Sequence, residues 1–159
     1  MEIKWYDKEI LDLIKANQTE AMKEVCQFLV EDVKDSMVAG TGEWYRSKKG
    51  DGSWHQAATP GVPPAPDTEE LKDSICWSIS NGETSGTESG DANIETPGID
   101  GLNVEGRVGT TNSKGGWQEL GLLYTKKQIP PQEKARPFLR PSLEKNSEEI
   151  INILGSKKI

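Results

Sequence analysis

The first long pattern of apolar and polar positions covers residues 7–38 and has the period of a helix. Its apolar members recur at spacings of three and four, which places them on one stripe of a helix surface. They are Ile10, Ile14, Met22, Val25, Cys26, Leu29, Val33 and Met37. We therefore predict a long N-terminal helix with a core-facing stripe. The stripe weakens near Asn17, so a second helix start at Thr19 is an alternative, and Gly40 is the expected stop.

Residues 40–67 carry no helical stripe and are predicted to form a long loop or a hairpin. Aromatic residues and a histidine flank the turn signal Gly50-Asp51-Gly52. They are Trp44, Tyr45, Trp54 and His55. The proline-rich residues 60–66 are expected to be extended, because proline fixes its own φ and restricts the preceding residue. A loop of this length in a small domain is often functional, and the two tryptophans favour a contact surface that a partner would order.

The region from 71 to 120 is predicted to hold a small antiparallel β-sheet of about four strands. In Leu71–Ser80, apolar residues alternate with polar ones, as in a strand with one buried face. The apolar residues are Ile75, Trp77 and Ile79. Further strands are expected at Ile94 and over residues 102–108, where glycines mark the turns between them.

A helical pattern returns over residues 137–155. Pro141 suits the first turn of this helix, and Gly155 is a natural stop. A short apolar stripe lies between them, made of Leu143, Ile150, Ile151 and Leu154. The order of helix, long loop, sheet and helix predicts an α+β fold, with both helices packed on the sheet. A length of 159 residues fits a single domain, residues 1–159.

Charge and cysteine content narrow the function further. The net charge is −7 and the pI about 4.9, whereas proteins that bind phosphate backbones usually carry a basic patch. We therefore expect no specific nucleic-acid binding. No apolar run approaches the roughly 20 residues that span a bilayer, and the acidic start lacks the apolar centre of a signal peptide. Cys26 and Cys76 are too few for a disulfide scaffold and are expected to be small buried hydrophobic residues.

The sequence offers little to a catalytic interpretation. His55 is its single histidine, and no metalloprotease, nucleophile-elbow, phosphate-loop or CxxC spacing is present. No stretch has the alternating oxygen ligands of a calcium loop. We therefore predict no catalytic residue, no cofactor and no metal site, and expect a protein that is not an enzyme. Tryptophan, tyrosine and arginine are the residues that dominate interface energies, so the loop at 40–67 favours an interaction protein.

Three strings, in this order and at roughly this spacing, resemble the head–tail joining family of tailed bacteriophages, also called the minor capsid or tail-completion family. They are GVPPAPDTEELKDSI at Gly61–Ile75, GGWQELG at Gly115–Gly121 and KARPFLRPSLEKN at Lys134–Asn146. The resemblance covers most of the chain, and ARPFLRP is its specific element. Two departures stand out. Glu69 occupies a position where the family pattern has glycine, and an unusually long LLYTKKQIPPQEK follows the short GGWQELG turn.

The resemblance implies a structural virion protein that completes the tail and joins it to the head. It implies a ring in the neck, expected to be a hexamer, in contact with a head-closure or connector protein and with the tail terminator or tail tube. The protein would be located in the virion at the head–tail interface, and in the host cytoplasm during assembly. DNA would pass through an acidic lumen without stable contacts, because like charges repel.

Two alternatives to this function remain open. The chain could be the tail terminator of the same tail, which is similar in size and also forms rings. From a different class, it could be a monomeric carbohydrate- or peptide-binding module that uses Trp44 and Trp54.

The ARPFLRP run also has a physical interpretation. Its prolines restrict the preceding residues Arg136 and Arg140 to extended backbone, and either arginine could pair with Glu119 in a bidentate contact. Phe138 and Leu139 would dock on the sheet and anchor the start of the last helix. The run is therefore either a rigid entry to a core helix or a direct contact with a partner.

Overall fold

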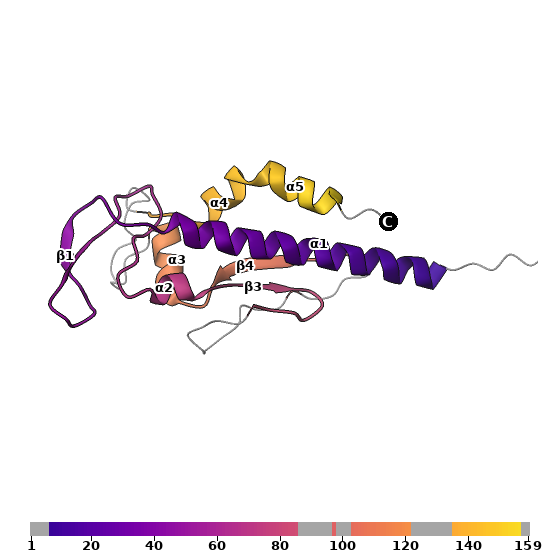
Figure 1. The fold of residues 1–159 in the computed structure, drawn as a ribbon, viewed down its shortest axis with the longest axis horizontal. Coiled ribbons are helices and arrows are strands. Elements are labelled where there is room, and N and C mark those ends of the chain that lie inside the picture. The colour runs from indigo at the N-terminus through magenta and orange to yellow at the C-terminus, as the bar shows by residue number, and fades with distance from the viewer. Residues whose placement is uncertain (1–6, 86–96, 98–102, 122–134, 157–159) are drawn as a thin grey trace, which may run out of the picture.

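A computed structural model of the chain describes residues 7–85, 97, 103–121 and 135–156. One long helix, α1 (Asp7–Ser36), extends along the long axis of the molecule (Figure 1). It runs through Thr19 without a break, so the alternative of a second start there is wrong. Gly40 does not end this helix. It lies instead against the backbone of Gln56, where a Cβ would stand 2.0 Å from the carbonyl oxygen.

The strands form two separate antiparallel pairs. β1 (Trp44–Arg46) pairs with β2 (Trp54–Gln56), and β3 (Ile75–Ile79) pairs with β4 (Gly106–Thr110). The α+β class is confirmed, but the described strands do not share a single sheet. The hairpin 44–56 extends from one end of the molecule, and neither of its short strands pairs with β3 or β4 (Figure 1). The strand expected at Ile94 lies outside the described residues.

The core lies between α1 and the β3–β4 pair, and the C-terminal run adds a phenylalanine to it. Its buried members are Cys26, Val30, Val33, Met37, Ile75, Trp77, Ile79 and Phe138. Gly106 permits the close approach of sheet and helix, since a Cβ there would stand 2.6 Å from the sulfur of Cys26 and 2.7 Å from that of Met22. The predicted stripe of α1 is therefore its packing face over much of its length. Ile10 is an exception, being 50% exposed.

The prediction of one buried face for the first core strand is wrong, because every residue of β3 is buried. Cys76 and Ser78, which alternate with the large apolar residues, are fully enclosed. Small side chains such as these can be buried at low cost when their polar groups find partners. At the start of the strand, the hydroxyl groups of Ser74 and Thr110 are 2.6 Å apart, within hydrogen-bonding distance.

Two short helices flank the β3–β4 pair. α2 (Glu70–Asp73) directly precedes β3, and α3 (Ser113–Leu120) follows β4. The side chain of Asn112 caps α3 by accepting a hydrogen bond from the Lys114 backbone N–H, 2.9 Å away. The string GGWQELG was expected to be a short turn, but the cap and the absence of β-branched residues make it helical. Gly121, with a left-handed φ of 71°, ends this helix.

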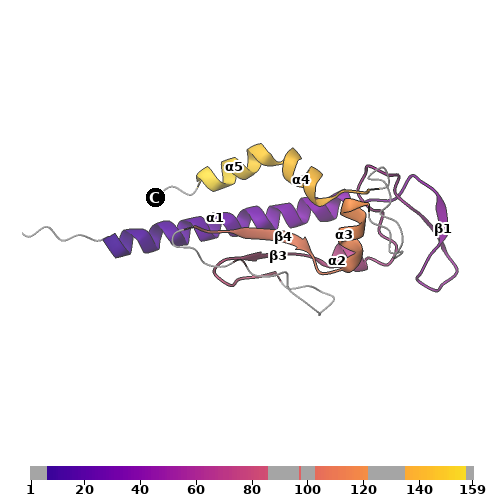
Figure 2. The ribbon, with the colours of Figure 1, turned by 180° about the vertical axis from the view of Figure 1, so that it is seen from behind.

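The C-terminal segment folds as two helices along α1, not as the single predicted helix (Figures 1 and 2). α4 (Leu139–Lys145) and α5 (Ser147–Ser156) are separated at Asn146. The Asn146 side chain donates to the Ser142 carbonyl at 2.8 Å, which competes with helix continuation. Asp32 of α1 holds α4 in place. Its carboxylate accepts hydrogen bonds from the Ser142 hydroxyl at 2.6 Å and from the Lys145 ammonium at 2.9 Å.

Candidate functional site

The hairpin 44–56 presents one face rich in aromatic and cationic groups. In its register Trp44 lies opposite Gln56, and Arg46 lies opposite Trp54. Cross-strand partners and alternate residues share a face of an antiparallel pair. Trp44, Arg46 and Trp54 are therefore on one side, which we call the tryptophan face. Tyr45 is on the other side, opposite the histidine.

The tryptophan face is open to solvent. Trp44 is 61% exposed and Trp54 is 66% exposed. Both side chains have a large apolar surface whose burial would be favourable. Arg46, between them in the register, is exposed as well. Exposed tryptophan beside arginine is the composition of an interface hot spot. This face can bind a partner surface, and no group in it is poised for bond-making chemistry.

The tip of the hairpin is set by the turn that the sequence predicts. Gly50 and Gly52 both have a left-handed φ of 79°, which glycine adopts without strain. Between them, the Asp51 carboxylate accepts a hydrogen bond from the Ser53 backbone N–H at 2.8 Å. The predicted hairpin is therefore confirmed, and its strands are held by a defined turn.

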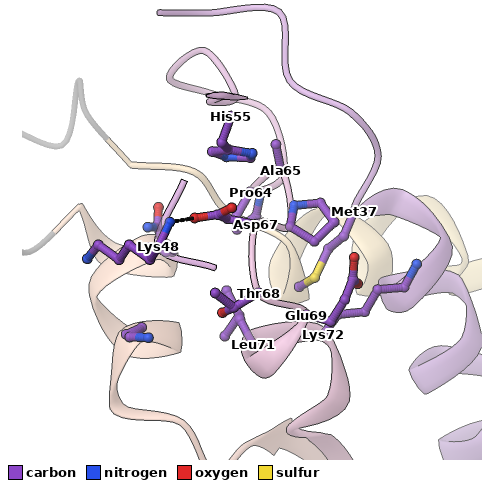
Figure 3. A pocket seen from close by; sticks show the side chains of 13 residues that line it. Met37, Lys48, His55, Pro64, Ala65, Asp67, Thr68, Glu69, Leu71 and Lys72 are labelled. Atoms are coloured by element: carbon purple, nitrogen blue, oxygen red, sulfur yellow. Dashed lines mark hydrogen bonds between the residues drawn. The ribbon is translucent and has the colours of Figure 1, made fainter. Parts of the chain in front are cut away.

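A single carboxylate fastens the turn side of the hairpin, directly after β1, to the body. The side chain of Asp67 accepts hydrogen bonds from the Ser47 hydroxyl at 2.6 Å and from the Lys48 backbone N–H at 3.0 Å (Figure 3). These two bonds, the Lys48 contact first, hold the pKa of Asp67 below its ordinary value. Sequence reasoning missed this residue, and its place directly after the proline run is the only signal that could have indicated it.

A cavity of about 210 Å³ lies beside Asp67, between the hairpin, the proline run and α2 (Figure 3). His55 and Asp67 lie at one side of it, and Met37, Leu71 and Lys72 at the other. The polar side chains that line this cavity come from several separate segments of the chain. Within the described part of the chain, no three His, Cys, Asp or Glu residues gather as metal ligands would.

Arg136 and its neighbour join the C-terminal run to the base of the hairpin, just after β2. The Arg136 Nε donates to the Ala58 carbonyl at 2.8 Å, and its backbone N–H donates to the Gln118 carbonyl at 2.7 Å. The backbone N–H of Gly61 donates to the Ala135 carbonyl at 2.7 Å. The segment after the hairpin, the end of α3 and the start of the ARPFLRP run therefore meet at one junction.

Glu119 caps α4, which corrects the predicted pairing with an arginine. One of its carboxylate oxygens accepts the backbone N–H groups of Phe138 at 2.7 Å and Leu139 at 3.0 Å, and the other accepts that of Arg140 at 3.0 Å. Phe138, at the N-cap position, has no side chain that can do this. The first N–H groups of a helix lack acceptors within the helix and carry partial positive charge. The Glu119 carboxylate therefore binds these fixed N–H groups and not a flexible arginine side chain.

The remaining residues of the run divide between the core and the surface. Phe138 is fully buried among the residues of β3 and α1, and Leu139 packs partly against the same cluster. Arg140 is exposed. Phe138 is thus a core anchor, and of the two arginines of the run Arg140 is the more exposed.

An apolar groove of about 470 Å³ runs between α1, β4 and the start of α4. Cys26 lies in its floor, and burial raises the pKa of this thiol to about 11. The thiol is therefore neutral at physiological pH and behaves as a small hydrophobic group.

Comparison of the chain with models of protein families, with curated proteins and with solved structures gives no match. None of the helices that the structure describes is long and apolar enough to cross a membrane.

Proposed function

We propose that this protein is a structural component of a tailed-phage or prophage virion that completes the tail and joins it to the head as a ring. The observation that carries the proposal is the direct contact between two of the three strings that resemble the head–tail joining family. Glu119 of GGWQELG caps the helix that ARPFLRP begins, through three backbone hydrogen bonds. The strings lie far enough apart in the chain that their contact reflects the tertiary fold.

A second observation supports the same resemblance. Glu69 stands where the family pattern has glycine, and its φ of 62° is left-handed. It is the single non-glycine residue with positive φ in the described part of the chain. A backbone of this shape favours glycine, so the family pattern and the local geometry agree at this position.

In this proposal the hairpin 44–56 contacts a neighbouring protein, and the ARPFLRP junction holds the hairpin on the body of the molecule. The two tryptophans contribute little to the stability of the free protein, because their side chains remain largely in water. A neighbouring subunit or neck protein that accepts them would remove that apolar surface from solvent. We expect the hairpin to be more mobile in the free protein than in the virion.

The test is deletion of residues 44–56 in the phage or induced prophage that encodes the chain. The domain should fold with unchanged hydrogen-exchange protection in β3 and β4, since the hairpin contributes no residue to the core. Separate heads and tails should accumulate, and purified full-length protein should restore joining in an extract. Particles that assemble fully and fail only at adsorption would contradict the proposal and make the hairpin a receptor-binding device.

The same experiment separates the tail terminator, the nearest alternative. A terminator ends tail growth, so tails formed without it would vary in length. Tails of uniform length that remain unattached to heads would favour the joining role.

The exposed tryptophan face keeps a ligand-binding module as a second candidate. Trp44 and Trp54 lie on one side of the hairpin, where they could stack on a sugar or a peptide. Titration of the monomer with glycans and peptides, followed by tryptophan fluorescence, tests this function. A saturable change that Trp44→Ala abolishes, in a protein that joins no tails, would favour the module.

A further inference from the structure

The two outer edges of the β3–β4 pair differ. The outer edge of β3 is covered by the segment that follows it, since the Ile79 N–H donates to the Glu83 carbonyl at 3.0 Å. The Ser85 N–H likewise donates to the Trp77 carbonyl at 3.1 Å. Every residue of β3 is buried, whereas every residue of β4 is half-buried. β4 is therefore the more open strand of the pair.

The hydrogen-bond pattern identifies the β4 backbone groups that face outward. In an antiparallel pair, alternate residues bond to the partner strand, and the residues between them direct their N–H and C=O groups to the other side. The Ser80 N–H donates to the Glu105 carbonyl at 3.0 Å, so Gly106 and Val108 direct theirs away from β3. Among the described residues, no strand other than β3 pairs with β4, and no backbone group bonds to this outer edge.

The outer edge of β4 opens into the apolar groove of about 470 Å³. Gly106 and Val108 lie on one side of this groove, and the C-terminal helices supply Leu139, Leu143 and Ile150 on the other. In both views β4 lies on the side of β3 that is nearer to these helices (Figures 1 and 2). A further strand beside β4 would therefore pack alternate side chains against an apolar wall.

The groove also has a charge without a partner. Glu119 and Arg140 are the charged residues that line it. The Glu119 carboxylate already accepts three backbone N–H groups at the start of α4. Arg140 is exposed, and it forms no salt bridge with another described residue. A carboxylate on a bound molecule would complement this guanidinium.

From the open edge, the apolar wall and the unpaired guanidinium we infer that the groove binds an extended segment of another protein as an added β-strand beside β4. The backbone of the segment bonds to Val108, its alternate apolar side chains pack on Leu143, and an acidic residue faces Arg140. An edge strand is a template for such addition, in which backbone bonds give affinity and the alternate side chains give specificity. The site is separate from the hairpin 44–56 and does not depend on the proposed function.

A synthetic peptide tests the inference. The probe is a fluorescein-labelled octapeptide in which valine alternates with threonine between two terminal aspartates, and fluorescence polarisation measures its binding to the full chain. Two further peptides are N-methylated, one at the valines and the other at the threonines. A strand presents these two sets of N–H groups on opposite edges. Methylation of the set that faces β4 should abolish binding, and methylation of the other set should change the affinity less than twofold.

Two variants of the protein test the two sides of the groove. Val108→Pro removes an outward N–H of β4 without removing a bond to β3, and proline is tolerated on edge strands. Leu143→Asn removes part of the apolar wall. Each should weaken binding of the unmethylated peptide at least tenfold. Leu13→Asn is the control, because Leu13 is 52% exposed, against 53% for Leu143, and lies outside the groove.

Circular dichroism checks that the variants fold, and if Val108→Pro does not, Leu143→Asn and the methylated peptides still decide the question. The inference is overturned if the unmodified protein does not bind the peptide, if both methylated peptides bind equally, or if Leu143→Asn binds as the control does. A protein that is dimeric in sedimentation velocity and becomes monomeric as Val108→Pro would also overturn it. The occupant of the edge would then be β4 of a second copy.

Discussion

The hairpin 44–56 and the run 136–141 both place arginine near an aromatic residue, but their surroundings differ. Phe138 has no exposed surface, and the backbone on either side of it is fixed by Glu119 and Gln118. Trp44 and Trp54 are mostly exposed, and the Asp67 hydrogen bonds that hold their hairpin to the body reach Ser47 and Lys48, in the turn after β1. Residue type therefore does not separate a core anchor from a contact surface, whereas the hydrogen bonding of the neighbouring backbone does.

The largest expected effect is that of Phe138→Ala. Removing a fully buried phenylalanine should lower the free energy of unfolding by about 3–5 kcal/mol, because a cavity remains between α1 and β3. Urea denaturation measures this loss. Trp54→Ala is the matched change in the hairpin and should stay within about 0.5 kcal/mol of the unmodified protein. Equal losses of unfolding free energy in the two variants would contradict the distinction between a buried anchor and an exposed contact residue.

A smaller loss is expected for Glu119→Ala. The change leaves three backbone N–H groups at the start of α4 without their acceptor, which should cost about 1–3 kcal/mol. Thermal melting gives the loss, and Glu144→Ala, an exposed glutamate of the same helix, is the control. Unchanged stability of Glu119→Ala would mean that water replaces the carboxylate and that the junction is less rigid than its hydrogen bonds suggest.

Glu69→Gly tests the boundary between the proline run and the packed sheet. Relief of the left-handed backbone should stabilise by about 1 kcal/mol, and the greater freedom of glycine in the unfolded chain should offset part of this, leaving a gain of roughly 0.5 kcal/mol. Lys72→Gly, inside α2, should instead destabilise the protein. If both changes destabilise the protein, the Glu69 side chain must stabilise the fold by more than its left-handed backbone costs.

The smallest effect is a pH dependence where Asp67 holds the hairpin. The pKa of Asp67 is lowered in the folded protein, so its contribution to stability is present above an ordinary aspartate pKa of about 3.9 and is lost as pH falls through the lowered value. In Asp67→Asn this part of the acid sensitivity should disappear. Denaturation at pH 7 and below pH 4 measures it, with Asp35→Asn on the exposed side of α1 as the control. Identical profiles for the two variants would show that Asp67 does not fasten the hairpin.

Sequence reasoning worked where the signal was local and periodic. The stripe of α1 predicted a helix that the structure has, and Gly50 and Gly52 predicted the turn of the hairpin. It failed where distant groups decide the outcome. The acceptor for the α4 N–H groups is a glutamate from another helix, about 20 residues earlier in the chain. The break at Asn146 is different, because it depends on a local side-chain bond to the backbone four residues earlier that the helical stripe does not reveal.

The same limit applies to the candidate site. The tryptophans could be named from residue type, and Arg46 follows from strand alternation once the hairpin is assumed. Asp67 could not be found in this way, because its partners lie about 20 residues earlier in the chain. Whether two aromatic segments are buried or exposed is a property of the whole fold, so no short window of sequence contains it.

The junction at Arg136 has a consequence for how the chain can vary in length. The backbone returns after residue 134 to the end of α3, where Arg136 donates to Gln118 and Glu119 receives the start of α4. With both ends of this connection fixed, a longer insert adds only loop-closure entropy, about 0.6 kcal/mol for each doubling in length. A change in the number of residues between Gly121 and Ala135 is therefore compatible with the same position of α4. The same position should accept an engineered epitope tag, which would allow the protein to be located by antibody labelling.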